Sequence, residues 1–351
     1  NESVPTITLA TSASTIDENS SSTVTLTATS SIVASKDITV TLATTGTGTN
    51  GTDYSALNAT TITISAGATT GTKTFTITDD SVYEGNETVI VAISSVSGSN
   101  AVEYGGNQSV TTTITENESA PTVTLATSAT SIAENSSTTI TLTATASQIA
   151  DEDITVTLAT TGTGTDGTDY SAVNRTTITI SAGSTTGTKT FTMADDSVSE
   201  DDETAIVAIS AVSGGGATES GTQSVTVTIT DNDSPQITLT SSVSSLAENS
   251  STTVTLTATS SMTSTSDITV TLATAGTATD GTDYSAVNGT TITISAGSTT
   301  GTKTFTMTND SSSESDETII TSISGVSGGN AAESGSQSVT FTIVDDESTP
   351  V

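Results

Sequence analysis

The chain has 351 residues, a length that corresponds to one to three domains. Its 39 acidic residues against 5 basic ones give a formal net charge of −34, which argues against nucleic acid or an anionic membrane surface as a partner. The absence of Cys excludes disulfide bonds and thiol redox chemistry, and no apolar run approaches the ~18 residues of a membrane helix, so direct membrane insertion is not expected.

Short segments with alternating apolar and Thr or Ser residues run through the first third of the chain. The alternation and the abundance of Thr, Val and Ile are typical of antiparallel strands with one apolar face. Turn signals such as "SAGATTG" and "GTNGTDY" separate them. Seven short strands in such a length predict an immunoglobulin-like sandwich. The segments are 6–10, 22–29, 37–43, 60–65, 72–78, 87–94 and 109–115.

This pattern occurs three times along the chain. The motif "TIDENSSSTVTLTATS" (15–30) returns in close variants at 131–146 and 245–260. A repeat of about 115 residues has the size of a whole domain rather than of a solenoid turn. The sequence therefore predicts an all-β chain of three tandem, seven-stranded antiparallel sandwiches arranged as a rod. The expected domains are 1–118, 119–233 and 234–351.

The two ends of the chain correspond to the same phase of this repeat. Asn1 aligns with Asn117, and Val351 aligns with about Thr122. We therefore expect the third domain to continue into a next repeat or into a neighbouring subunit. Each sandwich should span about 40 Å, so three in line predict a rod of about 120 Å.

Each repeat carries one Phe and one Tyr at matching positions. The Phe residues belong to the inward face, and each buried apolar side chain contributes roughly 1.5–3 kcal/mol to stability. The Tyr of each "TDYS" is expected to be a half-buried ring that holds its loop, with sugar stacking as the alternative. These residues are Phe75, Phe191, Phe305, Tyr54, Tyr170 and Tyr284.

Acidic residues gather at three places in each repeat. In the first they are Glu18, the stretch "TDDSVYEGNET" (78–88) and the strand exit at Glu116 and Glu118. The topology of a sandwich brings these three places to one end of the domain, beside the linker. Two carboxylates ~5 Å apart repel by about 3 kcal/mol at an effective dielectric constant of 20, so the group needs protons or a cation. A solvated acidic loop is the alternative.

Among cations, Ca²⁺ suits these residues best, because it takes 6–8 oxygen ligands in flexible geometry. Zinc is disfavoured, since the chain has no His or Cys, and Mg²⁺ tolerates an irregular cage less well.

The segment "GTGTNGTDYSALNATTITISAGATTGTKTFTITDDSVYEGNETVIVAIS" (46–94), followed by "TITENE" (113–118), resembles the Calx-beta family. The resemblance covers all three repeats. The family occurs in sodium–calcium exchangers and in many bacterial surface proteins. It implies an immunoglobulin-like sandwich in which some members bind calcium at the distal loops near the domain junction.

The resemblance implies a set of calcium ligands in each repeat. Calcium-sensing members also carry an acid where this chain has Thr45, Thr161 and Ala275, and Asn309 replaces an aspartate, so we expect fewer ions per junction and the weakest sites in the third domain. The implied ligands are Glu18, Asp79, Asp80, Glu84, Glu87, Glu116, Asn117 and Glu118; Glu134, Asp195, Asp196, Glu200, Glu203, Asp231, Asn232 and Asp233; and Glu248, Asn309, Asp310, Glu314, Glu317, Asp345, Asp346 and Glu347.

Catalysis is not expected. A Ser-His-Asp triad is impossible without His. Paired carboxylates can cleave glycosides, but the chain has no Trp and only five Tyr with which to line a sugar cleft.

We therefore predict a structural repeat module of an extracellular bacterial surface protein, such as an adhesin stalk, matrix protein or filament, stiffened by calcium at the domain junctions. Its expected partners are adjacent repeats of the same protein. Two alternatives are a calcium-responsive module that binds a ligand or partner, and a self-assembling extracellular fibre whose identical subunits exchange strands across exposed edges.

Overall fold

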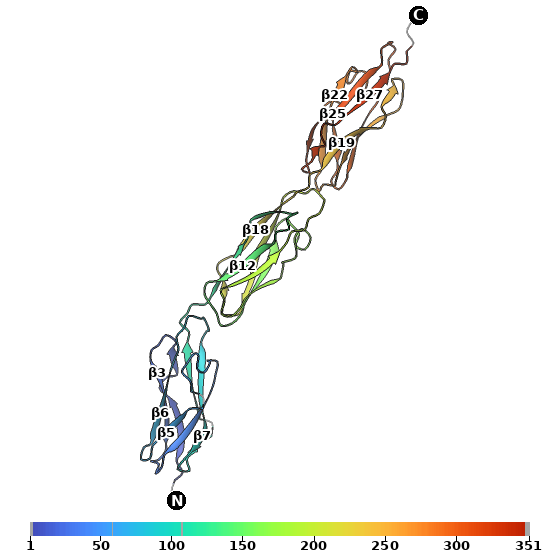
Figure 1. Ribbon diagram of the computed structural model, residues 1–351. Helices are drawn as coiled ribbons and strands as arrows, with labels where there is room; N and C mark the ends of the chain where they lie inside the picture. The colour runs from blue at the N-terminus through green and yellow to red at the C-terminus, as the bar shows by residue number, and fades with distance from the viewer. Residues whose placement is uncertain (1–2, 58, 107, 348–351) are drawn as a thin grey trace.

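The computed structural model describes residues 3–57, 59–106 and 108–347. Figure 1 shows three elongated domains arranged end to end, with the chain termini at opposite ends of the rod. The secondary structure of these residues is all strand, in three repeated sandwiches, so the predicted fold class is confirmed. None of them forms a helix long and apolar enough to cross a bilayer. The predicted continuation at residues 1–2 and 348–351 lies outside the described residues.

Each domain places its strands in one four-stranded and one five-stranded sheet. In the first domain the orders are β6-β3-β1-β8 and β2-β9-β7-β4-β5. Their bounds are β1 Thr6–Thr11, β2 Thr15–Asp17, β3 Thr23–Ser30, β4 Ile38–Thr45, β5 Thr61–Ile64, β6 Thr70–Thr76, β7 Glu87–Ser97, β8 Val102–Glu103 and β9 Ser109–Thr115.

The second and third domains repeat this topology strand for strand. The second contains β10 Thr122–Thr127, β11 Ser131–Ala133, β12 Ile140–Ala146, β13 Ile154–Thr161, β14 Thr177–Ile180, β15 Thr186–Phe191, β16 Glu203–Ser213, β17 Thr218–Glu219 and β18 Ser224–Thr230. The third contains β19 Gln236–Ser241, β20 Ser245–Ala247, β21 Val254–Ser260, β22 Ile268–Gly276, β23 Thr291–Ile294, β24 Thr300–Phe305, β25 Glu317–Ser327, β26 Ala332–Glu333 and β27 Ser338–Val344.

All seven expected segments of the first domain form strands, and β2 and β8 come in addition. Both extra strands pair in parallel, β2 with β9 and β8 with β1, whereas the expected sheets were purely antiparallel. At two or three residues each, they are too short to show the alternation by which strands are recognised in a sequence. The chain therefore passes from the four-stranded sheet, which contains β1, to the five-stranded sheet, which contains β2.

The Tyr rings lie deeper than the sequence suggested. Tyr54, Tyr170 and Tyr284 are each only 1% exposed, so the prediction of half-buried rings was wrong and sugar stacking is excluded. The ring of Tyr54 packs edge to face against Phe75 with centroids 5.9 Å apart. Such aromatic pairs contribute about 0.5–1.5 kcal/mol beyond their buried area. The loop with the motif "TDYS" (52–55), which we call the Tyr loop, is thus anchored in the core beneath the end of the domain.

The first domain completes its own sheets within the described residues. Its strand β1 pairs with β3 and with β8 of the same domain. A self-contained first domain counts against the strand-exchange form of the fibre hypothesis.

Loops of adjacent domains meet through short parallel β-bridges. Tyr83, in the loop between β6 and β7, bridges to Ala150 of the second domain. Ser199, at the matching place in the second domain, bridges to Ser264 of the third. Each junction therefore has a backbone contact in addition to the linker.

Candidate metal centres

Strand pairing brings two distant acids to the same end of the first domain. Asp17 at the end of β2 stands opposite Thr115 at the end of β9, in parallel register. The next residues, Glu18 and Glu116, therefore leave the sheet side by side, and the amide of Glu18 donates to the carbonyl of Thr115 at 3.0 Å. The short strand β2 is thus the element that places Glu18 beside the linker.

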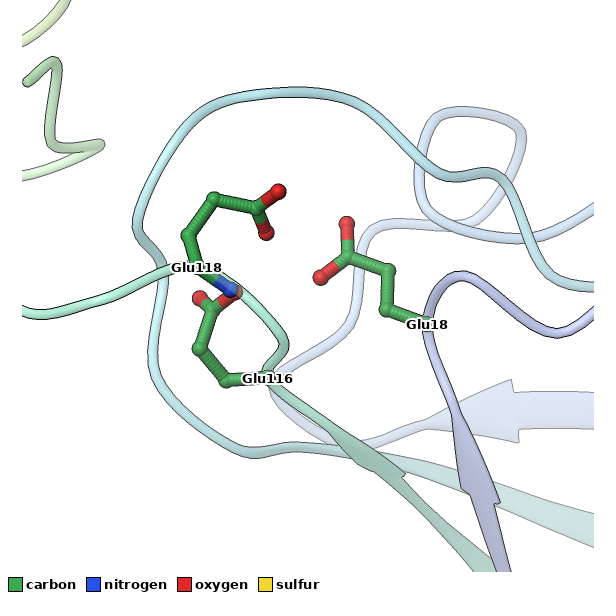
Figure 2. Close-up of side chains that lie close together, drawn as sticks. All are labelled: Glu18, Glu116 and Glu118. Atoms are coloured by element: carbon green, nitrogen blue, oxygen red, sulfur yellow. The ribbon is translucent and has the colours of Figure 1, made fainter.

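Glu18, Glu116 and Glu118 form the first cluster of the domain, which we call the linker cluster. Each offers a carboxylate oxygen, and these oxygens all lie within 4.8 Å of one another. Figure 2 shows the three carboxylates facing a common space. Three negative charges at such distances repel one another unless a proton or a cation lies between them.

Backbone amides hold Glu116 in its charged form. Its Oε2 accepts hydrogen bonds from the amides of Glu84 at 2.6 Å and Gly85 at 2.8 Å, and its Oε1 accepts from Glu118 at 2.9 Å. Burial opposes ionisation, but these amides outweigh it and lower the pKa of Glu116. Glu116 therefore joins the linker to the β6–β7 loop.

The pKa of Glu18 shifts upward, in the opposite direction to that of Glu116. Its side chain is only 5% exposed. This burial, followed by the charges of Glu116 and Glu118, raises the pKa of Glu18 from 4.5 to about 7. Glu18 is thus costly to ionise, whereas Glu116 beside it is ionised. A cation bound between them would stabilise the charged forms of both.

A second cluster, which we call the loop cluster, consists of Asp53, Glu84 and Glu87. Asp53 belongs to the Tyr loop, and its Oδ2 accepts from the amide of Thr49 at 2.5 Å. Burial and then the charge of Asp53 raise the pKa of Glu84 to about 7 and that of Glu87 to about 8. Asp151 of the second domain adds to both shifts, so this cluster lies at the junction.

Asp53 and its counterpart Asp169 were missing from the predicted ligands. The sequence did carry a signal, because "GTDYSA" recurs in every repeat with its aspartate in place. In the sequence, the Tyr ring alone is enough to explain that motif, so the aspartate does not stand out as a ligand. Burying the ring beneath the loop holds the preceding aspartate, Asp53, near Glu84 and Glu87.

The second domain repeats both clusters, and the third repeats one. Glu134, Asp231 and Asp233 form the linker cluster of the second domain, and Asp169, Glu200 and Glu203 form its loop cluster. In the third domain the linker cluster is Glu248, Asp345 and Glu347. Within the described ranges, Asp283, Glu314 and Glu317 do not close into such a group. Burial is the first cause that raises the pKa values of Glu134, Glu203 and Glu248 to about 7.

The other predicted ligands border the clusters without joining them. Asp80 accepts from the amide of Val82 at 2.7 Å, and Asp196 and Asp310 make the same turn. Asn117 donates to Glu118, Asn232 accepts from Asn135, and Asn249 donates to Asp346. Asn309 donates to the carbonyl of Asp310 at 3.2 Å. The Asp79 charge contributes to the raised pKa of Glu118, and the Asp195 charge to that of Asp233.

Every linker cluster contains buried carboxylate oxygens with no hydrogen-bond partner. They are Oε2 of Glu118, Oε1 of Glu134, Oδ2 of Asp233, Oε1 of Glu248 and Oε2 of Glu347. Leaving a buried charged group without a partner is costly. The five basic residues belong to other segments: Lys36, Lys73, Arg175, Lys189 and Lys303. A bound cation would supply the missing partner in all three domains.

The sandwich topology, the repeats and these loop acids agree with one family. The Calx-beta domain model matches residues 1–118, 116–233 and 231–347. The chain belongs to the Calx-beta family. The three tandem Calx-beta domains form a structural repeat, as the sequence predicted. No curated protein matches the chain significantly.

Solved structures similar to this Calx-beta chain include CBD12 domains of CALX and a protein of Yersinia pseudotuberculosis. CBD12 from CALX1.2 is 16% identical, covers 63% of this chain and 99% of its own, and has a TM-score of 0.29. The calcium binding domain CBD12 of CALX1.1 is 15% identical over 61% and 96%, with a TM-score of 0.27. InvD of Yersinia pseudotuberculosis is 16% identical over 96% of both chains, with a TM-score of 0.30.

The residues of this Calx-beta chain suit calcium. All donors in the clusters are oxygens, several are buried without partners, and the set mixes charged and readily protonated carboxylates. In the first domain Glu18, Glu116 and Glu118 would hold one ion, and Asp53, Glu84 and Glu87 would hold another. Bound calcium would neutralise the repulsion and join the loops that carry the acids.

Proposed function

We propose that this chain is a non-catalytic structural module of an extracellular bacterial surface protein, such as an adhesin stalk, matrix protein or filament. Calcium at the domain junctions would stiffen it. Its domains would be 1–118, 119–233 and 234–351. The observation that carries the proposal is the position of the acidic clusters at the linker end of each sandwich, in domains that stand end to end (Figure 1).

The contacts of Glu116 explain how an ion there would act on the junction. Glu116 and Glu118 open the linker, and Glu116 also holds the amides of Glu84 and Gly85 in the loop that reaches the second domain. An ion bound to this group would tie the linker to that loop. An ion that binds only the ordered arrangement stabilises it, by about 2.7 kcal/mol at a free concentration of 100 times its Kd.

The number of carboxylates suits a site for extracellular calcium. Each cluster holds three carboxylates. Extracellular calcium modules have Kd values of about 10⁻⁴–10⁻³ M, in contrast to the tighter sites of intracellular sensors. The charge of −34 and the Thr-rich outer faces of the strands further support a spacer that stays hydrated.

The test is a distance distribution across the first junction. Because the chain has no Cys, spin labels on Thr63→Cys and Thr179→Cys, both exposed, report on the first two domains. We expect calcium to narrow the distribution and a chelator to broaden it. In the Glu116→Gln variant the distance distribution should stay broad in calcium. In the control variant Asp201→Asn, which changes an exposed acid outside both clusters, calcium should still narrow it. A distance distribution of the same width with and without calcium would refute the stiffening role.

A further inference from the structure

The two internal junctions use the same backbone geometry with different side chains. In both, the loop after the sixth strand of one domain lies against two loops of the next. The loop residue is Tyr83 at the first junction and Ser199 at the second. The receiving residue is Gly216 at the first and Asn330 at the second, and both have positive φ, 59° and 50°. Residues with positive φ are commonly Gly or Asn.

The first junction pairs Tyr with Gly for steric reasons. The amide of Tyr83 donates to the carbonyl of Ile149 at 2.9 Å, and the amide of Asp151 donates back to Tyr83 at 3.2 Å. A Cβ on Gly216 would lie only 2.4 Å from the Tyr83 ring. Any side chain at position 216 would therefore displace the ring.

The second junction pairs Ser with Asn through hydrogen bonds. The amide of Ser199 donates to Thr263 at 3.0 Å, and its hydroxyl donates to the carbonyl of Gly329 at 2.9 Å. The amide group of Asn330 donates to the carbonyl of Glu200 at 3.1 Å and to Asp231 at 3.2 Å. The small Ser leaves the room that the Asn side chain occupies.

The two outer ends of the rod carry the Ser–Asn combination. At the N-terminal face of the first domain, Asn100 stands where the repeats place Gly216 and Asn330, and its φ is 53°. In the third domain, Ser313 stands where they place Tyr83 and Ser199. The first and third domains, which carry these two surfaces, lie at opposite ends of the molecule (Figure 1).

Both surfaces are exposed here, whereas their internal counterparts are covered. Val33 is 60% exposed and Ile32 is 36% exposed, but Ile149 and Gln148, at the same positions in the second domain, are half-buried. Ser313 is exposed, but Ser199 is 0% exposed. A hollow of about 350 Å³ lies at the face of the first domain, lined in part by Ile32, Val33 and Ser99. This face of the first domain is thus equivalent to the one that the Tyr83 loop covers in the second domain.

We propose that the N-terminal face of the first domain docks the Ser313 loop of a second copy of this chain. The contacts would repeat the second junction: Ser313 would pair with the Val33–Ser35 backbone, and Asn100 would donate to the carbonyl of Glu314. The contact is heterologous, so it generates an open head-to-tail chain. The proposal goes beyond the calcium-stiffened rod and does not depend on it.

The association is expected to be weak and salt-dependent. At the internal junctions the linker keeps both surfaces at an effective concentration in the mM range, which separate copies lack. Their net charges of −34 also repel, and salt screens this repulsion. The contact should therefore appear at high protein concentration and in at least 0.3 M salt, where the Debye length is below ~8 Å.

Sedimentation velocity over a concentration series tests the proposal, with chelator present to separate it from calcium binding. The weight-average mass of the unaltered chain should rise with concentration. Val33→Asp should abolish the rise by placing a charge on the apolar face. Ser313→Tyr should abolish it because Asn100 leaves no room for the ring. The double variant Asn100→Gly/Ser313→Tyr recreates the first junction and should restore it.

Mixing the two blocked variants provides the sharpest test. The Val33→Asp variant keeps an unaltered Ser313 loop, and the Ser313→Tyr variant keeps an unaltered N-terminal face. The loop of the first can bind the face of the second, so their mixture should form dimers and nothing larger. Thr74→Tyr, an exposed position on β6, is the matched control for a surface Tyr. A monomer at all concentrations would overturn the proposal. So would association that survives Val33→Asp, or that Ser313→Tyr strengthens, since the latter would show that the face prefers a Tyr loop.

Discussion

The linker ends of the first and third domains follow the same strand plan but differ in their acidic clusters. In the first domain the loop acids Glu84 and Glu87 close with Asp53 into a compact group, and Tyr83 beside them is held by the second domain. In the third domain every residue of the loop 311–316 is exposed, and Glu314 stays outside any such group among the described residues. Contact with a following domain thus accompanies a closed loop cluster.

The two internal junctions differ in the charge that the following domain contributes. Asp151 faces the loop cluster of the first domain and raises the pKa values of Glu84 and Glu87. At the second junction the matching position is Thr265, which has no charge. At the first junction the following domain therefore adds a negative charge to the loop cluster, which it does not do from this position at the second. The domains are similar units, but their neighbours make the sites unequal.

The largest expected effect is the loss of calcium stabilisation in Glu116→Gln. Glu116 belongs to the linker cluster and holds the loop of the second cluster, so its neutralisation weakens both. Calcium should raise the Tm of the unaltered first domain by roughly 10 °C, from about 2.7 kcal/mol of binding energy at 100 times Kd. Differential scanning calorimetry with calcium and with chelator measures this gain, and Glu116→Gln should lose most of it.

The matched substitution in the third domain is Asp345→Asn. It touches only one cluster, so we expect about half the loss. Equal losses in the two domains would contradict the inequality of their sites, and an effect of Asp201→Asn would indicate a general charge effect.

A dependence of stability on pH in the absence of calcium should come next in size. The folded chain raises the pKa of Glu18 and Glu84 from 4.5 to about 7 and that of Glu87 to about 8. Between pH 4.5 and these values the folded state binds more protons than the unfolded state, so stability is greatest below the window and falls as pH rises through it. In chelator, Tm should therefore rise from pH 8 to pH 5.

Calcium competes with those protons and should weaken or reverse this trend. Glu18→Gln/Glu87→Gln should flatten the chelator profile, because the amide does not titrate. A chelator profile that falls on acidification between pH 8 and pH 5 would show that the carboxylates are charged without cost, against the proposed role.

A change in ion number should distinguish Asp53→Asn from Asp283→Asn. Asp53 is part of a closed loop cluster. Asp283 has a neighbour in Glu317, but among the described residues no third carboxylate joins them within 4.8 Å. Equilibrium dialysis at a fixed calcium concentration should show one ion fewer per chain for Asp53→Asn. Asp283→Asn should leave the number unchanged. A loss in both variants would mean that the third domain completes its cluster when calcium is present.

The smallest expected effect is that of Gly216→Ala at the first junction. The new Cβ would lie 2.4 Å from the Tyr83 ring, so the ring must move and its contact with the second domain weakens. Gly221→Ala is the matched control, because Gly221 has a similar positive φ of 69° but no atom within 4 Å of its Cβ position. Both lose about 1 kcal/mol to backbone strain. Only Gly216→Ala should also broaden the spin-label distance distribution across the first junction.

The fold could be predicted from the sequence because its signals are local. Alternation of apolar and polar residues depends on neighbours two positions apart, and it marked every long strand. The repeat of the same motifs likewise indicated three domains before any contact was known. The strands β2 and β8 were not predicted, because each has only two or three residues and pairs in parallel with a distant segment.

The acidic sites depended on contacts far apart in the sequence. Composition and spacing predicted that the acids gather at one end of each domain. Their division into two clusters follows from strand pairing and from the burial of Tyr54, which holds Asp53 in its loop. The difference between the junctions lies in single residues, such as Tyr83 with Gly216 and Ser199 with Asn330. Their meaning emerges only when the domains are placed end to end, since no local pattern encodes which residues of two domains will touch.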